Sequence, residues 1–320
     1  MSLAKIVKTI AQHKTFLIST HINPDADALS SELAMALYLK RLGKKVHVIN
    51  ADDVPPRLSF LPSTGLIKNV QKILGLDYDA AIVLDCGDLD RIEKVKSLIQ
   101  KDKILINIDH HLTNDCFGKI NYVDPKASST AEVLFDLFKT ARFSLTKEMA
   151  VLLYLGIMTD TGSFRYDSTT AYTHAVAAEL MKFDFSVSEL YRKLYERVPF
   201  DDLKLFTKVI NRFEKLYDGR VVYVEMRKKT VEQFSAEFDV RDKMFNFLRA
   251  IKGVEVIIIL TEHGPNMTRA NLRSQGDTVN VADLAYFFKG GGHRKASGCM
   301  IHSGLIEAKE KLLSQLEKIL

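Results

Sequence analysis

The sequence predicts an α/β protein in which a mainly parallel sheet flanked by helices is followed by a smaller α+β domain. Up to about residue 185, short apolar segments alternate with helical patterns, which is typical of βαβ units. Beyond about residue 215, two strand patterns follow each other closely enough to form a hairpin. A length of 320 residues also suits two domains better than one.

Four short apolar segments are the strands that we expect in the first half, at residues 15–20, 45–50, 80–85 and 103–109. Helical patterns occur near the N-terminus, at residues 30–42 and at residues 90–100. Gly43 suits the C-terminal end of the second helix. Strands and helices in this alternation predict a parallel sheet.

The chain becomes mainly helical from Ser129. Ser129 and Glu132 fit a capping box before residues 133–138. Further helices are expected at residues 147–158, 171–183 and 186–197, the last of them ended by Pro199. We therefore expect a first domain over residues 1–185, a helical connection over 186–215 and a second domain over 216–320.

The second domain begins with a strand pattern at residues 221–226 and a helical pattern at 231–250. Strands are then expected at 254–261 and 267–273, and the residues His263-Gly264-Pro265-Asn266 predict a hairpin turn between them. A last helix at 281–288 leads into a glycine-rich segment. Mixed strands and helices of this kind predict an α+β domain.

The composition excludes several classes of protein. With 47% hydrophobic and 27% charged residues, the chain is globular rather than disordered. Its three cysteines (Cys86, Cys116 and Cys299) are widely spaced and support neither a disulfide framework nor a zinc ribbon, so we expect a reducing, cytoplasmic location. No apolar run approaches the length of a membrane span. Serine-hydrolase, P-loop and zincin motifs are absent from the sequence.

Polar residues follow the first predicted strand, in the segment His21-Ile22-Asn23-Pro24-Asp25-Ala26-Asp27. If this segment is extended, His21, Asn23, Asp25 and Asp27 point to one side, because side chains of a strand repeat every two residues. This arrangement favours a metal site. The alternative is an Asp-rich loop that caps the next helix.

Two more predicted strands end in residues that bind metals: Asp85 after one, and Asp109-His110-His111 after the other. Ligands of open α/β sheets bind beyond the carboxyl ends of the strands. Asp160, after an apolar helix, could add a fourth element. Two histidines and four aspartates exceed the needs of one ion and fit two, and the imidazoles move the preference from Mg²⁺ towards Mn²⁺ or another transition metal. Two such ions can activate a hydroxide for in-line attack on a phosphoryl group.

A glycine-rich segment near the C-terminus runs from Gly290 to Gly298 and contains Arg294, Lys295 and Ser297. Consecutive backbone N–H groups and these donors favour anion binding, whereas the alternative is a flexible turn. Upstream, Arg269, Asn271 and Arg273 share one face of a predicted strand. They could bind a second phosphate or form a solvated face. The net charge of +5 belongs entirely to residues 186–320, because residues 1–185 hold equal numbers of acidic and basic side chains.

Together these motifs resemble the DHH phosphoesterase superfamily, whose name-giving triplet would be Asp109-His110-His111. The segments HINPDADA (21–28) and TDTGSF (159–164), the isolated Asp85 and the Gly-Gly-Gly-His sequence at 290–293 complete the resemblance over nearly the whole chain. Length and domain pair are most similar to the bacterial bifunctional oligoribonuclease and pAp phosphatase (nanoRNase) group, with dinucleotide phosphodiesterases as close relatives.

The resemblance implies a role for each matching residue, at an active site in the cleft between a DHH domain and a DHH-associated domain. One Mn²⁺ would be held by His21, Asp25 and Asp85, and the other by Asp27, Asp85, His110 and Asp160. Mg²⁺ or Co²⁺ are alternatives. Asp109 would orient the network, and His111 would act as an acid or stabilise charge. The substrate-binding residues implied are Asn23, Arg269, Arg273, Ser274, Gly291, Gly292, His293 and Arg294.

The activity that the resemblance implies is hydrolysis of short 5′-phosphorylated oligonucleotides and dinucleotides to mononucleotides, and of pAp to AMP. Candidate substrates are nanoRNA, pApA, pGpG and cyclic di-AMP. Neither a membrane nor a long nucleic acid is expected as a partner, and a homodimer is compatible with the sequence. Three alternatives remain: a family II inorganic pyrophosphatase, a RecJ-like single-strand exonuclease and a non-hydrolytic nucleotide sensor.

Overall fold

The computed structural model describes residues 2–73, 75–276 and 278–320. The chain divides into two compact units, Met1–Glu196 and Arg197–Leu320, each with its own sheet. This division falls inside the segment 186–215, which the sequence predicts as the connection. Among the described residues, no helix is both long and apolar enough to cross a membrane.

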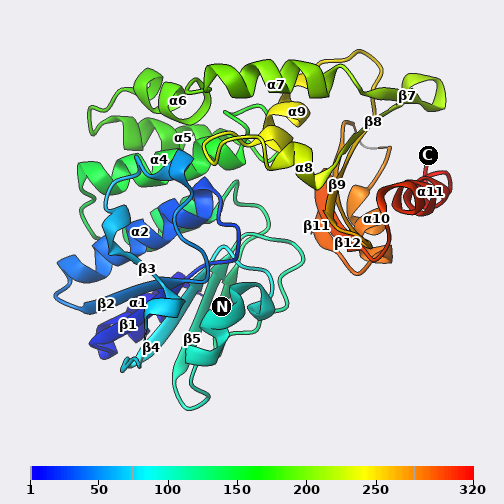
Figure 1. Cartoon of the computed structure of the whole chain (residues 1–320). Coiled ribbons are helices and arrows are strands. Elements are labelled where there is room, and N and C mark those ends of the chain that lie inside the picture. Colours follow the sequence, from blue (N-terminus) through cyan, green and yellow to red (C-terminus); the bar gives the residue numbers. More distant parts are fainter. Residues whose placement is uncertain (1, 74, 277) are drawn as a thin grey trace. The chain divides into compact units, whose positions relative to one another are not determined.

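The first unit is built on a six-stranded sheet in which all neighbouring strands are parallel (Figure 1). In spatial order the strands are β3 (Ile67–Asn69), β2 (Lys45–Asn50), β1 (Thr15–Ser19), β4 (Ala80–Leu84), β5 (Ile104–Asp109) and β6 (Ile120–Val123). The chain builds outwards from β1 to one side and then from β4 to the other. The carboxyl ends of β1 and β4 therefore flank the point at which such sheets bind their ligands.

The described residues of this unit form six α-helices: α1 (Leu3–Gln12), α2 (Ala26–Arg41), α3 (Thr130–Thr140), α4 (Lys147–Asp160), α5 (Ala171–Met181) and α6 (Val187–Tyr195). Alternate residues of β1 enter different cores. Phe16 and Ile18 pack against the helices, and Leu17 packs on the other face with Ile92 and Val95. Figure 1 shows α2 and α4 stacked on the same side of the sheet. Both faces are thus covered, as a parallel sheet requires.

The sequence predicted the main strands and helices of this unit, and three details differ. The helix expected at 90–100 is a 3₁₀ helix (Leu89–Leu98), interrupted at Glu93 by a positive φ of 44°. The capping box at α3 is half formed, because the Ser129 hydroxyl accepts from the Glu132 N–H while the Glu132 carboxylate accepts from Ser128 instead. Pro199 does not end α6, which stops at Tyr195, but precedes the next helix.

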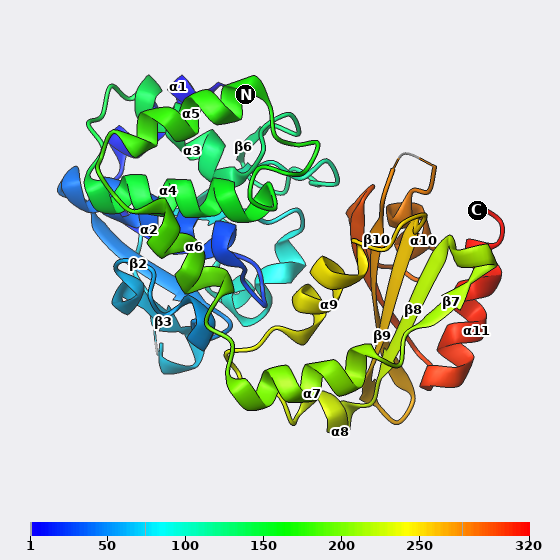
Figure 2. The ribbon, with the colours of Figure 1, turned by 90° about the horizontal axis from the view of Figure 1, so that it is seen from above.

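The second unit contains a six-stranded mixed sheet, in which only β8 and β9 pair in parallel. Its strands in spatial order are β11 (Gly291–His293), β12 (Ala296–Ile301), β10 (Met267–Ser274), β9 (Val256–Gly264), β8 (Val221–Met226) and β7 (Glu214–Leu216). One core lies under α10 (Val281–Phe287) and α11 (Leu305–Leu316), and the other under α7 (Phe200–Ile210) and α9 (Val240–Leu248). Figure 2 shows α9 and α11 on opposite sides of β8 and β9.

Three expectations for this unit were wrong in detail. The helical pattern at 231–250 forms two helices, α8 (Lys228–Val231) and α9, with a non-helical segment between them. The hairpin strand β9 extends to Gly264, so the turn is Pro265-Asn266. The alternative of a flexible turn does not hold for the whole glycine-rich segment, because Gly291–His293 form an edge strand paired with β12.

Candidate metal centre

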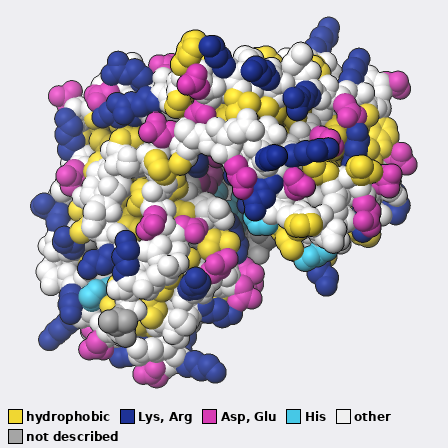
Figure 3. All heavy atoms as spheres, viewed as in Figure 1, with side chains coloured by type: hydrophobic (Ala, Val, Ile, Leu, Met, Phe, Trp, Pro, Cys, Tyr) yellow, Lys and Arg dark blue, Asp and Glu magenta, His cyan; other side chains and the backbone are white. Residues whose placement is uncertain are grey.

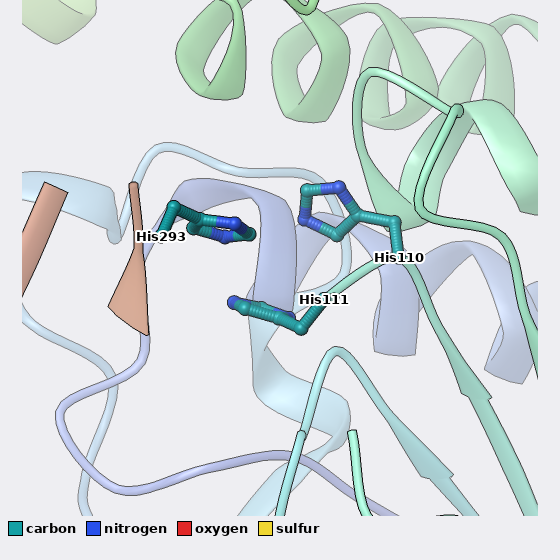
Figure 4. A group of neighbouring side chains, drawn as sticks. All are labelled: His110, His111 and His293. Atoms are coloured by element: carbon teal, nitrogen blue, oxygen red, sulfur yellow. The ribbon is translucent and has the colours of Figure 1, made fainter. Parts of the chain in front are cut away.

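Three adjacent parallel strands, β1, β4 and β5, deliver polar side chains to one edge of the first sheet. His21 lies two residues beyond the end of β1, and Asp85 follows β4 directly. Asp109 is the last residue of β5, and His110 and His111 come next. The rings of His110 and His111 lie 4.8 Å apart between centroids and are tilted by 60° (Figure 4). The convergence that the sequence predicted at strand ends is therefore present.

The segment from His21 to Asp27 is not extended, so the period-two argument for it was wrong. Asn23 has a left-handed φ of 51°, and Asp25 is the N-cap of α2, where it accepts a hydrogen bond of 3.0 Å from the Ala28 N–H. Asp27 already belongs to the first turn of the helix. The loop thus combines both interpretations, because Asp25 caps a helix and also lies beside His21.

The structure brings the six predicted ligands into two groups, and Asp85 of the first group also lies next to His110 of the second. His21, Asp25 and Asp85 offer ligand atoms within 4.8 Å of one another, and so do Asp27, His110 and Asp160. The Asp85 carboxylate lies between the groups, with Oδ2 3.6 Å from His21 Nε2 and Oδ1 3.6 Å from His110 Nε2. This is the arrangement that a bridging carboxylate requires.

The backbone at Asp85 is held in an uncommon conformation. Its φ is 53°, and its side chain is almost completely buried. A left-handed conformation at a residue other than glycine costs about 1–3 kcal/mol and is concentrated at functional sites. Its Oδ1 also accepts a hydrogen bond of 2.9 Å from the Thr130 hydroxyl. The fold therefore fixes this carboxylate from both its backbone and its side chain.

Asp27 is held by the N-terminus of α3. Its two carboxylate oxygens accept from the N–H groups of Thr130 and Ala131, at 2.8 and 3.0 Å. A helix N-terminus stabilises a negative charge, so these bonds favour the ionised carboxylate. Gly156 on α4 leaves space for it, since a Cβ there would overlap Asp27 Oδ1 and the Ala131 methyl group.

The histidines differ in the nitrogen that they present to the centre. His21 Nδ1 lies 2.7 Å from the Ile22 carbonyl oxygen, and His110 Nδ1 lies 3.4 Å from that of Ala127. Donation from Nδ1 leaves the lone pair of Nε2 directed at the carboxylates, as in metal-binding histidines. His111 is turned the other way, because its Nδ1 lies 2.7 Å from Asp109 Oδ1.

Asn114 supports this last pair. Its Nδ2 donates to Asp109 Oδ2 at 2.6 Å and to the carbonyl oxygen of Cys86 at 3.0 Å, and lies 3.2 Å from Asn107 Oδ1. The sequence prediction missed Asn114, Thr130 and Gly156. The glycine inside an otherwise apolar helix was the one signal that could have been followed, because such glycines usually have a packing or functional reason.

The electrostatics of the centre favour a cation. Burial and the charges of Asp85 and Asp160 raise the pKa of Asp27 well above its usual value. Burial also raises the pKa of Asp160 to about 6. For Asp85 burial acts in the same direction, but His21, His111 and His110 outweigh it and lower the pKa. Carboxylates that repel one another, of which Asp27 and Asp85 are buried, form with the imidazole nitrogens a donor set that fits Mn²⁺ and similar divalent ions.

The remaining predicted residues lie outside these groups. Asn23 is exposed, and its backbone N–H donates to Asp52 Oδ2 at 2.6 Å. The second unit holds the others: Arg269, Arg273 and Ser274 on β10, Gly291, Gly292 and His293 on β11, and Arg294 in the turn that follows. Ser274 Oγ donates to the Arg294 carbonyl oxygen at 3.3 Å, which joins the two segments.

Comparison with known proteins finds a matching family model for each of the two units. The model of the DHH family, N-terminal domain, matches residues 15–157, and that of the DHHA1 domain matches residues 218–320. The chain is 29% identical to the bifunctional oligoribonuclease and PAP phosphatase NrnA of Bacillus subtilis, over 98% of this chain and 97% of the relative. It is 32% identical to the protein of the same name from Thermus thermophilus, over 99% and 93%.

A solved structure has the same fold over nearly the whole length. It is the crystal structure of an exopolyphosphatase-related protein from Bacteroides fragilis, with a TM-score of 0.88 and 28% sequence identity. The match covers 99% of this chain and 95% of that one.

Proposed function

This chain belongs to the DHH family and is a metal-dependent phosphoesterase, and we propose that it hydrolyses short 5′-phosphorylated oligonucleotides and dinucleotides to mononucleotides, and pAp to AMP. The names of the similar full-length relatives support this substrate class. The observation that carries the proposal is the position of Asp85, whose two oxygens face two separate groups of ligands.

The proposed cofactors are two Mn²⁺ ions. His21, Asp25 and Asp85 would hold one, and Asp27, Asp85, His110 and Asp160 the other. Bound ions would polarise the phosphoryl group and lower the pKa of a water molecule to supply the nucleophile. The buried, mutually repelling carboxylates and the Nε2 atoms directed at them support this assignment.

His111 is the proposed proton donor to the leaving oxygen. Burial alone would lower the pKa of His111, but the hydrogen bond to Asp109 and the charge of Asp85 raise it to about 9. At neutral pH the ring would therefore be protonated and could donate from Nε2, since Nδ1 is engaged by Asp109. Asp109 orients the ring, and the exposed side chain of Asn23 is proposed to contact the phosphate.

The second unit is proposed to bind the rest of the substrate through Arg269, Arg273, Ser274, Gly291, Gly292, His293 and Arg294. Its net charge supports this role, because the whole +5 of the chain lies beyond Glu196. Action in a reducing cytoplasm, as expected from the cysteines, and assembly as a homodimer remain part of the proposal.

The test is a comparison of substrates with the purified full-length chain. Initial rates with Mn²⁺, Mg²⁺ and Co²⁺ would be measured for pApA, pGpG, pAp, cyclic di-AMP and inorganic pyrophosphate, with products separated by chromatography. The proposal expects mononucleotides from the linear dinucleotides and AMP from pAp. Pyrophosphate as the best substrate, or tight nucleotide binding without cleavage, would overturn it.

A further inference from the structure

Strand β2 ends at the same edge of the first sheet as β1, β4 and β5, yet it supplies none of the six candidate ligands. Its last residue, Asn50, is almost completely buried and bonds to neighbouring elements instead. The Asn50 Oδ1 atom accepts a hydrogen bond from the Thr20 N–H at 3.4 Å, and Nδ2 donates to Glu32 Oε1 at 2.7 Å. One buried amide thus joins the end of β1 to helix α2.

Thr20 connects β1 with β4 beyond their last paired residues. The pairing of the two strands ends one residue earlier on each of them, and the Thr20 hydroxyl then donates to the Leu84 carbonyl oxygen at 2.9 Å. Thr20 directly precedes His21, and Leu84 directly precedes Asp85. This bond therefore fixes the relative position of two candidate ligands, whose Nε2 and Oδ2 atoms lie 3.6 Å apart.

Glu32 extends these contacts into the interior of the unit. It lies on α2, whose N-cap is Asp25 and whose first turn contains Asp27. The Glu32 side chain is fully buried, and Leu29 and Leu33 of the same helix belong to the apolar core. Its Oε2 atom has no hydrogen-bond partner among the residues that the structure describes. Burial raises the pKa of Glu32 to about 8, so the carboxyl group is mostly neutral at pH 7.

Stability alone does not account for the buried polar series formed by Glu32, Asn50 and Thr20. A buried polar group adds little net free energy even when it is paired, and an unpaired one is costly. Apolar side chains of similar volume would fill the same space without that cost, as replacements of buried ion pairs in other proteins show. The buried polar series is therefore explained better by what it arranges than by the stability that it adds.

The three elements that the buried polar series joins carry four of the six candidate ligands: His21 after β1, Asp85 after β4, and Asp25 and Asp27 at the start of α2. A metal site holds its ligands within about 0.5 Å of the productive geometry. We propose that Glu32, Asn50 and Thr20 position these four ligands relative to one another, so that they are in place before an ion binds. This inference rests on the two ions of the proposed function and adds three positioning residues to it.

Thr20→Val and Thr20→Ser test the bond to β4 in the full-length chain, with Mn²⁺ affinity measured by titration calorimetry on the metal-free protein. Valine keeps the shape of threonine but lacks the hydroxyl, so affinity falls by about 10–100-fold, the loss typical of groups that support metal ligands. Serine keeps the donor and the wild-type affinity. Thr9→Val in α1 is the matched control, because the buried Thr9 hydroxyl also donates to a backbone carbonyl oxygen, that of Lys5. Unchanged affinity in Thr20→Val, or an equal loss in Thr20→Ser or Thr9→Val, would overturn the inference.

Glu32→Gln and Glu32→Met test the other end of the buried polar series. Glutamine keeps an acceptor for Asn50 Nδ2, so Mn²⁺ affinity and kcat stay at the wild-type level. Methionine fills a similar volume without an acceptor, so Mn²⁺ affinity falls by about three- to tenfold, less than in Thr20→Val because the effect passes through Asn50. Thermal melts identify a temperature at which every variant is folded. A Glu32→Met chain with a lower Tm and wild-type Mn²⁺ affinity contradicts the inference. A wild-type chain that binds no Mn²⁺ contradicts the proposed function instead.

Discussion

The two units use their sheets in opposite ways. In the first, functional side chains gather at the edge of a parallel sheet, where Asp27, Asp85 and His110 are buried and held by several hydrogen bonds. In the second, the candidate residues lie on a mixed sheet that includes Gly291, which has free space above it. Charges needed for chemistry must be desolvated and fixed, whereas a surface that binds successive substrates must stay accessible.

The charge distribution follows the same division. The first unit has no net charge, although its centre is acidic, and the second carries the whole excess of +5. On the face drawn in Figure 3, acidic and basic side chains of the first unit lie interspersed. Its acidity is thus local and buried, which suits a bound cation. Substitutions in the first unit should therefore affect turnover and metal binding, and those in the second should affect substrate affinity.

The largest effect is expected for Asp85→Asn. This substitution removes the negative charge of the proposed bridging side chain and replaces one of its two carboxylate oxygens with an NH₂ group. Asparagine tolerates the left-handed φ of 53°, so the fold should be kept. Substitutions outside the ligand set already weaken metal sites by 10–100-fold, so we expect a loss of more than about 100-fold in kcat/KM and in Mn²⁺ affinity. Calorimetry and initial rates measure both. A variant that retains turnover would rule out the bridging role.

His111→Gln should lower kcat by about 100- to 10,000-fold while Mn²⁺ still binds. In the proposed mechanism the protonated ring is the active form, and its pKa is about 9, so wild-type kcat should fall as the pH rises through that value. The variant should lose this basic limb. A pH–rate profile between 6 and 10.5 checks the prediction, and an unchanged limb in the variant would assign it to another group.

Asn114→Ala should lower kcat by about 10–100-fold, because Asp109 and the Cys86 carbonyl lose the shared donor that orients them. Asn114 touches none of the six ligands in the hydrogen bonds described above, so Mn²⁺ affinity should stay within about twofold of the wild type. Titration calorimetry next to kinetics separates the two quantities. A parallel loss of metal would make Asn114 a support of the metal centre rather than of His111.

His293→Ala tests the second region. Loss of a charge-assisted hydrogen bond to phosphate costs about 1.5–3 kcal/mol, so KM for pApA should rise by roughly 10–100-fold with kcat and Mn²⁺ content nearly unchanged. His302→Ala on the same unit is the control. If kcat fell instead of KM rising, the division of labour between the units would be wrong.

The smallest effect is on stability. Burial raises the pKa of Glu32 to about 8, although the Asn50 hydrogen bond opposes this. Because the folded chain holds this proton more tightly than the unfolded chain, stability should fall as the pH rises from about 4.5 to 8. Glu32→Gln should remove that fall and raise Tm at pH 8, whereas Glu148→Gln at an exposed site should not. Thermal melts with and without Mn²⁺ measure this, and no difference between the variants would contradict it.

Sequence reasoning succeeded where the pattern is local. The apolar segments that became β1, β2, β4 and β5 were placed within a residue or two, and each candidate ligand was named from its place after a strand or helix. It failed where the same local sequence pattern can form two different structures. The helical pattern at 231–250 did not reveal the break before α9, and the three glycines gave no sign of the strand that pairing with β12 forms.

The sequence by itself determined the order of the main strands and helices, the family and the set of candidate ligands, because residue type and spacing are written along the chain. Only the tertiary structure decided how the candidate ligands are divided between the two groups. Asp25 and Asp27 are two residues apart yet join different groups, since one caps α2 and the other already lies in its first turn. Likewise Asn271 lies beside Gly298, and Gly298 beside Gly291, through strand pairing that no local pattern specifies.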